Sequence, residues 1–168
     1  MPTTIGYRRG NNAGLQLRGR QPIMLPAATA TGELPPGIHP AAWDEIEKRF
    51  GRGSEARVRA FGRLRLLHEL AIRTGCLARF LVFGSFVSGV PEPRDVDVAL
   101  VMTEDFRLEE TGRESRTLFS HPDAEARFGA SVFWVRQGLL PEDGMRKFLA
   151  TWQMKRDGTL RGMLEVKP

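Results

Sequence analysis

Two short apolar runs joined by a brief connection occupy the middle of this sequence. The first, residues 80–83, reads Phe-Leu-Val-Phe, a continuous apolar run of the kind that forms a buried strand. Residues 86–94 contain glycine and two prolines, which predicts a turn-rich connection. The second run, residues 95–102, begins with acidic and apolar residues in alternation, which is typical of a strand. The chain is therefore expected to build its fold around a β-sheet.

Helices are expected on either side of these strands. Trp43, Ile46 and Phe50 follow Pro40 at helical spacing, and Ser54 is a candidate N-cap for a second helix. We expect the apolar stripe of that second helix to consist of Val58, Phe61, Leu64, Leu67 and Ala71. Downstream we expect a polar helix over 107–119, a short helix over 123–128, a strand over 131–135, a helix over 141–153 and a strand over 160–166. This order predicts an α/β (α+β) fold, a small mixed sheet flanked by helices.

Positive charge is concentrated at the start of the chain. The 168 residues carry a net charge of +5, and four of the 25 Lys and Arg lie in residues 1–23, which contain no acid. The other 21 are nearly balanced by the 20 acids. We interpret residues 1–23 as a flexible basic tail and residues 24–168 as one domain. The tail is expected to be solvated; the alternative is that it binds a phosphate backbone nonspecifically.

Composition excludes several classes of protein. No apolar run approaches the length needed to cross a bilayer, and the N-terminus lacks the apolar centre of a secretory signal. Cys76 is the only cysteine, so neither an intrachain disulfide nor a cysteine-rich zinc site can form. We therefore expect a soluble, cytoplasmic protein without a membrane partner.

Chemistry-bearing residues gather at the two central strands. Gly84 and Ser85 directly follow the first strand, where glycine lets a phosphate approach the backbone and serine can donate its hydroxyl. Asp95 and Asp97 are two residues apart on the second strand, so both carboxylates project from one face. Such a pair favours a divalent cation with oxygen ligands, Mg²⁺ or Mn²⁺, which often brings substrate phosphates with it.

This arrangement resembles the signature of the polymerase-β-type nucleotidyltransferase superfamily, and particularly its small bacterial members. The resemblance rests on Gly84-Ser85 followed, after nine residues, by Asp95-Val96-Asp97. It implies that Asp95 and Asp97 hold Mg²⁺, that Gly84 and Ser85 hold the phosphates of an NTP, and that a nucleoside monophosphate passes to an acceptor hydroxyl. Residues 34–39 and 152–158 are also similar to segments of small nucleotidyltransferase-like bacterial proteins. Such proteins often occur in toxin–antitoxin or defence pairs, so the resemblance also implies a cognate partner.

One part of the superfamily pattern is missing. Its enzymes usually carry a third carboxylate on a later strand, but residues 131–135 contain no acid, and Ser131 stands about where it is expected. Glu165 on the last strand is an alternative source of a carboxylate, whereas Asp123 and Glu125 are expected to be solvated. The departure leaves two hypotheses open. The chain is either a transferase acting on a protein, tRNA or small molecule, or a catalytically degenerate nucleotide- or partner-binding module.

Several other residues are candidates for a functional role, or have a purely structural explanation. Arg94, next to the acid pair, is a candidate contact for a nucleotide phosphate. His121 is a candidate general base, with a surface or capping role as the alternative. His68 is expected to be a structural or surface residue and His39 a loop residue, and the two tryptophans at positions 134 and 152 are expected to lie in the core.

Overall fold

The computed structural model describes residues 24–166, and the expected basic tail at residues 1–23 lies outside them. A five-stranded mixed sheet runs through the domain in the order β1-β5-β2-β3-β4. The elements are β1 (Gly37–Ala41), α1 (Trp43–Phe50), α2 (Glu55–Ile72), β2 (Leu77–Phe83), β3 (Val96–Met102), α3 (Arg113–Arg116), α4 (His121–Phe128), β4 (Ala130–Arg136), α5 (Glu142–Gln153) and β5 (Gly162–Val166). The fold is thus α+β, a mixed sheet flanked by helices, as the sequence predicts.

Strand directions follow from the connections. β2 and β3 are antiparallel neighbours joined by the short segment after Phe83, while β3 and β4 are parallel and separated by the segment that holds α3 and α4. β5 returns antiparallel to β2, and β1 pairs with β5 in parallel at the outer edge. The strand with the acid pair, β3, therefore lies between β2 and β4.

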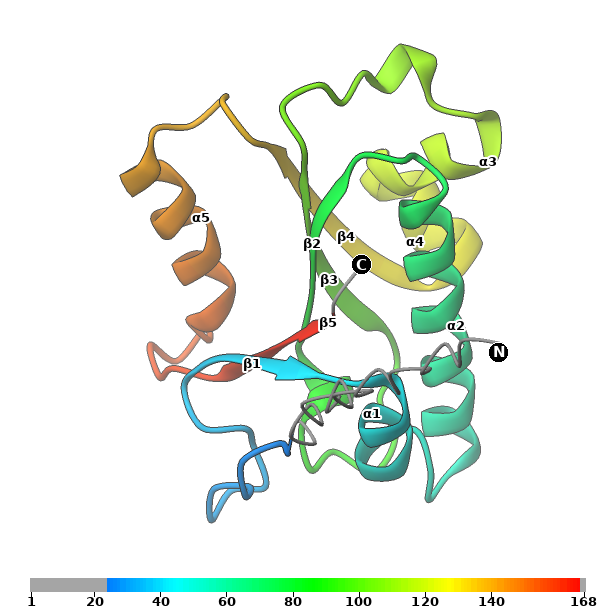
Figure 1. The fold of residues 1–168 in the computed structure, drawn as a ribbon. Helices are drawn as coiled ribbons and strands as arrows, with labels where there is room; N and C mark the ends of the chain where they lie inside the picture. Colours follow the sequence, from blue (N-terminus) through cyan, green and yellow to red (C-terminus); the bar gives the residue numbers. More distant parts are fainter. Residues whose placement is uncertain (1–23, 167–168) are drawn as a thin grey trace, which may run out of the picture.

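Helices cover the two faces of the sheet unequally. α2, α3 and α4 lie on one side in Figure 1, and α5 lies on the other. The larger core fills the first side, where Leu64 and Leu67 of α2 pack with Val82, Val98 and other strand residues. The smaller core lies under α5 and includes Leu81, Phe83, Ala99, Val101, Leu149 and Met163. Because side chains alternate along a strand, odd-numbered residues of β2 and β3 face α5.

The structure corrects three expectations. Pro40 belongs to the edge strand β1 rather than to the first turn of a helix, and α1 starts only at Trp43. Residues 107–119 form three short helical turns, not one helix. Val58 is 58% exposed, because α2 buries the neighbouring stripe through Arg57, Ala60, Leu64 and Leu67.

Several local predictions are confirmed. Ser54 caps α2, its hydroxyl accepting a hydrogen bond from the Arg57 backbone N–H. His68 is buried between Trp43 and Phe80, each with its ring centroid 4.9 Å from that of the imidazole. Within the described part of the chain, no helix is both long and apolar enough to cross a membrane.

Candidate functional site at the end of the second strand

The Gly-Ser pair lies where β2 ends. Gly84 has φ +80° and ψ −160°, a backbone conformation that is essentially confined to glycine. Ser85 then begins a single helical turn, residues 85–87, whose Phe86 and Val87 are buried. The turn is anchored in the core, so Gly84 and Ser85 are held at a fixed place beside β3.

The acid pair faces this turn. Asp97 lies opposite Phe83 of β2 and Ser131 of β4, on the face of the sheet that carries α5. A Cβ built on Gly84 would come 1.9 Å from Oδ2 of Asp97, so the carboxylate lies directly against the glycine. Asp95 precedes β3, and both acids are partly buried. The structure thus brings Asp97 against Gly84, next to Ser85, and Asp95 near enough to Asp97 for their charges to repel.

Burial and repulsion raise the pKa of Asp97 to about 6. Desolvation is the largest cause, and the nearby charge of Asp95 acts in the same direction. The positive charge of Arg161 and a hydrogen bond with the Ser131 side chain act against the rise. The net effect is that the charged form of Asp97 is disfavoured, and a bound cation would favour it.

Replacing Asp97 with asparagine is expected to raise the free energy of unfolding by about 1–3 kcal/mol above pH 6. The pKa of the folded state, about 6, lies above the ordinary 3.8, so folding favours the protonated acid. Its contribution to stability is complete at low pH and is lost as the pH rises from about 4 to about 6. Urea unfolding of both proteins from pH 4 to pH 8 measures the difference, with the exposed Asp123→Asn as control. A stability difference that does not change with pH would contradict the prediction.

Stacked aromatic rings lie beside the acid pair, beneath α5. Trp152 of α5 stacks on Phe133 with ring centroids 3.8 Å apart and on Phe83 with centroids 5.5 Å apart. The imidazole of His121 lies 5.4 Å from the Phe133 ring. Trp152 is partly buried, as expected of a core tryptophan.

A small pocket of about 140 Å³ opens beside the Gly-Ser turn. Gly84, Ser85, Ser88, Arg161 and Glu33 contribute to its lining. Glu33 is held by Lys155, whose Nζ lies 3.1 and 3.2 Å from the two carboxylate oxygens. The pocket therefore offers hydroxyl groups and one guanidinium next to the acid pair, a combination suited to an anionic ligand.

A buried arginine of α2 holds the connection after Ser85 in place. Arg57 of α2 is 8% exposed, and its Nη1 donates to the carbonyls of Phe50 (3.0 Å) and Phe86 (3.1 Å). Its Nη2 donates to the carbonyls of Ser88 (2.7 Å) and Val90. Burial lowers the pKa of this guanidinium, which nevertheless stays charged. One side chain thus satisfies three carbonyls of the connection and ties the connection to α2.

Two other candidates from the sequence lie apart from this pocket. Arg94 is exposed and lines a separate pocket of about 320 Å³ with Arg59 and Arg63. Glu165 forms two hydrogen bonds with Arg79, at 2.7 and 3.1 Å, and lies opposite Leu81 rather than Phe83. Among residues 24–166, no three His, Cys, Asp or Glu side chains come together in a way that could hold a metal ion. Asp95 and Asp97 therefore remain a pair.

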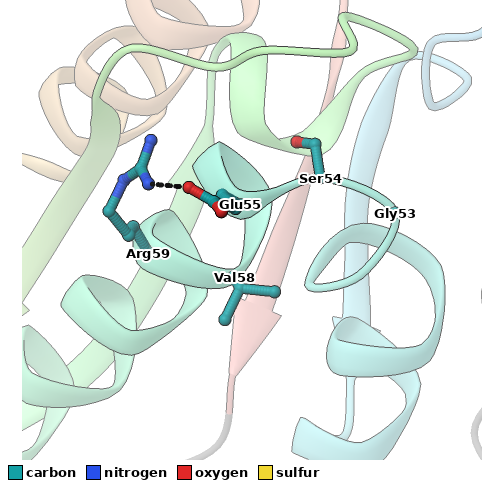
Figure 2. Close-up of a pocket in the computed structure, with 5 residues that line it drawn as sticks. All are labelled: Gly53, Ser54, Glu55, Val58 and Arg59. Atoms are coloured by element: carbon teal, nitrogen blue, oxygen red, sulfur yellow. Dashed lines mark hydrogen bonds and ion pairs between the residues drawn. The ribbon is translucent and has the colours of Figure 1, made fainter.

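A wider hollow of about 590 Å³ lies at the start of α2 (Figure 2). The residues that line it are Gly53, Ser54, Glu55, Val58 and Arg59, with Glu55 and Arg59 joined by an ion pair. It shares no residue with the pocket beside Ser85. Its Ser54 hydroxyl is engaged by backbone groups, and Glu55 and Arg59 are paired with each other. We therefore place the candidate site at the Gly-Ser turn.

Sequence reasoning missed Arg57 and Arg161. A signal for Arg57 was present: a stripe that keeps Leu64 and Leu67 but continues to Ala60 instead of Phe61 puts this arginine on the buried side. Arg161 gave no local signal, because it reaches the site only through the pairing of β5 with β2.

Comparisons with known proteins show the family of this chain. The model of a family of unknown function, DUF6932, matches residues 26–167. Neither the curated proteins nor the solved structures contain a match to this chain.

Proposed function

We propose that this chain, which belongs to the DUF6932 family of unknown function, is a Mg²⁺-dependent nucleotidyltransferase. The observation that carries the proposal is the contact of the Asp97 carboxylate with Gly84, which puts the acid pair directly beside the Gly-Ser turn. The proposed reaction transfers a nucleoside monophosphate from an NTP to a hydroxyl of a protein, a tRNA or a small molecule. A cognate partner protein belongs to the same proposal.

The acid pair fits a divalent cation. Asp95 and Asp97 are hard oxygen ligands, and the raised pKa of Asp97, caused first by burial and then by the charge of Asp95, is what a bound cation would lower. Both carboxylates would hold Mg²⁺ or Mn²⁺. When bound, such an ion supplies charge neutralisation for the phosphates and the leaving pyrophosphate.

The chain's own residues would bind and orient the nucleotide. Gly84 lacks the side chain that would displace the Asp97 carboxylate, and it lines the pocket together with Ser85, whose hydroxyl would donate to a phosphate oxygen. In the reaction the acceptor oxygen bonds to the α-phosphorus, the bond from that phosphorus to the bridging oxygen breaks, and pyrophosphate leaves. The proton of the acceptor hydroxyl passes to water.

A second candidate function is a binding module of the same fold without transfer. Ser131 lies opposite Asp97, at the place where the superfamily pattern calls for a third acid. Glu165 is already engaged by Arg79. A site with two carboxylates can hold a cation and a nucleotide and still lack the group that activates the acceptor.

Label transfer distinguishes the two functions. The purified chain is incubated with Mg²⁺ and each of the four α-labelled NTPs, with cell lysate or total tRNA as acceptor. We expect transfer that falls at least about 100-fold in Asp95→Asn/Asp97→Asn and on removal of Mg²⁺ with EDTA. The control Asp44→Asn/Asp123→Asn changes the net charge equally at two exposed acids, and it should transfer as the wild type does.

The other outcomes are equally informative. Binding of nucleotide with Mn²⁺, lost in Asp95→Asn/Asp97→Asn but without transfer to any acceptor, would support the binding module. Absence of both binding and transfer in the wild type would reject both functions.

A further inference from the structure

Arg161 brings a positive charge to the candidate site, although it is not part of the Gly-Ser and Asp-Val-Asp signature. It directly precedes β5, whose pairing with β2 carries it to the end of β2, where Gly84 and Ser85 follow. It lines the 140 Å³ pocket with both residues. Its positive charge also lowers the pKa of the Asp97 carboxyl, so the guanidinium is near the acid pair as well as in the pocket lining.

The guanidinium of Arg161 is held in place by its surroundings. Nε donates to the carbonyl of Trp152 at 2.9 Å, and the guanidinium carbon lies 4.9 Å from the centroid of the Phe83 ring. The backbone N–H donates to the carbonyl of Gln153 at 2.8 Å. Within residues 24–166, no hydrogen bond or ion pair engages the two terminal nitrogens. A planar fork of donors is thus fixed and remains available to a ligand.

Arg161 is the charged group of this pocket that a ligand would meet. Among the described lining residues it is the only cation, and the one acid, Glu33, is neutralised by Lys155. Ser85 adds a hydroxyl next to it. A guanidinium fork matches the paired oxygens of a phosphate, and such charge-assisted hydrogen bonds are stronger than neutral ones.

We propose that Arg161 binds the phosphate chain of the nucleotide in this pocket, together with Ser85. The inference rests on the proposed function and assigns a residue that the superfamily resemblance does not. The acid pair would hold the cation, while Arg161 and Ser85 would hold the phosphates in the pocket.

The test separates phosphate binding from cation binding in the full chain. Affinity for inorganic triphosphate with Mg²⁺ is measured by calorimetry, and affinity for Mn²⁺ alone by electron paramagnetic resonance. Arg161→Met is expected to weaken triphosphate binding at least tenfold and to leave Mn²⁺ binding unchanged or tighter, because a positive charge near Asp97 is removed. Arg161→Lys, which keeps the charge and loses the fork, should fall in between. The control is Arg156→Met, at an exposed arginine of the turn between α5 and β5. It should match the wild type in both measurements.

Each contrary result has a separate meaning. Triphosphate affinity within twofold of wild type in Arg161→Met overturns the inference and leaves the proposed function intact. Loss of Mn²⁺ binding in Arg161→Met also overturns it, because the residue would then shape the acid pair. If Arg161→Met does not fold, the result for Arg161→Lys is used instead. An affinity for triphosphate equal to that of the wild type in Arg161→Lys then overturns the inference. A wild type that binds neither probe overturns the proposed function and this inference together.

Discussion

Replacing Gly84 with alanine is expected to lower the free energy of unfolding by about 3 kcal/mol or more. Two costs combine. The backbone at φ +80° and ψ −160° is strained for any residue with a Cβ, at about 1–3 kcal/mol. The added Cβ would also lie 1.9 Å from Oδ2 and 2.8 Å from Cγ of Asp97, so the acid has to move. Urea unfolding measures the loss, and Mn²⁺ binding should fall with it because the acid pair is displaced.

A matched control isolates the position of this glycine. Gly62 lies within α2, and a Cβ there meets nothing within 4 Å. Gly62→Ala is therefore expected to stabilise the chain by about 0.5–1 kcal/mol, through the higher helix propensity of alanine. In Gly84→Ala/Asp97→Ala the collision is relieved and the backbone cost remains, so part of the stability should return. Equal stability of Gly84→Ala and wild type would contradict the close approach of Asp97 to the turn.

Replacing Arg57 with methionine is expected to cost about 3–5 kcal/mol of unfolding free energy. Methionine fills much of the same space but leaves the carbonyls of Phe50, Phe86, Ser88 and Val90 without this donor. Buried carbonyls without a partner are costly, and three of the four belong to the connection that follows Ser85. The connection should therefore loosen as well as the fold.

Unfolding and hydrogen exchange together test the role of Arg57. Protection of the amides in residues 85–91 should fall more than protection in β4, which the arginine does not touch. Arg59→Met, on the exposed side of the same helix, removes one surface ion pair with Glu55 and should change stability by less than about 0.5 kcal/mol. An equal effect of the two variants would show that the four hydrogen bonds contribute little.

Local patterns in the sequence predicted much of the sheet and its chemistry. The strands around 80–83, 95–102, 131–135 and 160–166 are observed, because apolar runs and alternation depend on neighbours along the chain. The meeting of Gly84 with Asp97 was also predictable, since a short connection between two strands forces them to pair. β1 was missed because its residues include Pro40, which disfavours a strand except at a sheet edge, where β1 in fact lies.

The nature of the site was predictable only in part. The Gly-Ser turn, the closeness of the two acids and the lack of an acid at Ser131 could be recognised from the sequence, because they depend on spacing within a short segment, although Asp95 precedes β3 rather than lying on it. Tertiary structure alone decided that Arg161 joins the site, that Glu165 is engaged by Arg79, and that Arg57 holds the connection. The physical reason is distance along the chain: pairing of β5 with β2 and the rotation of α2 on the sheet are set by packing between remote segments, which no local pattern records.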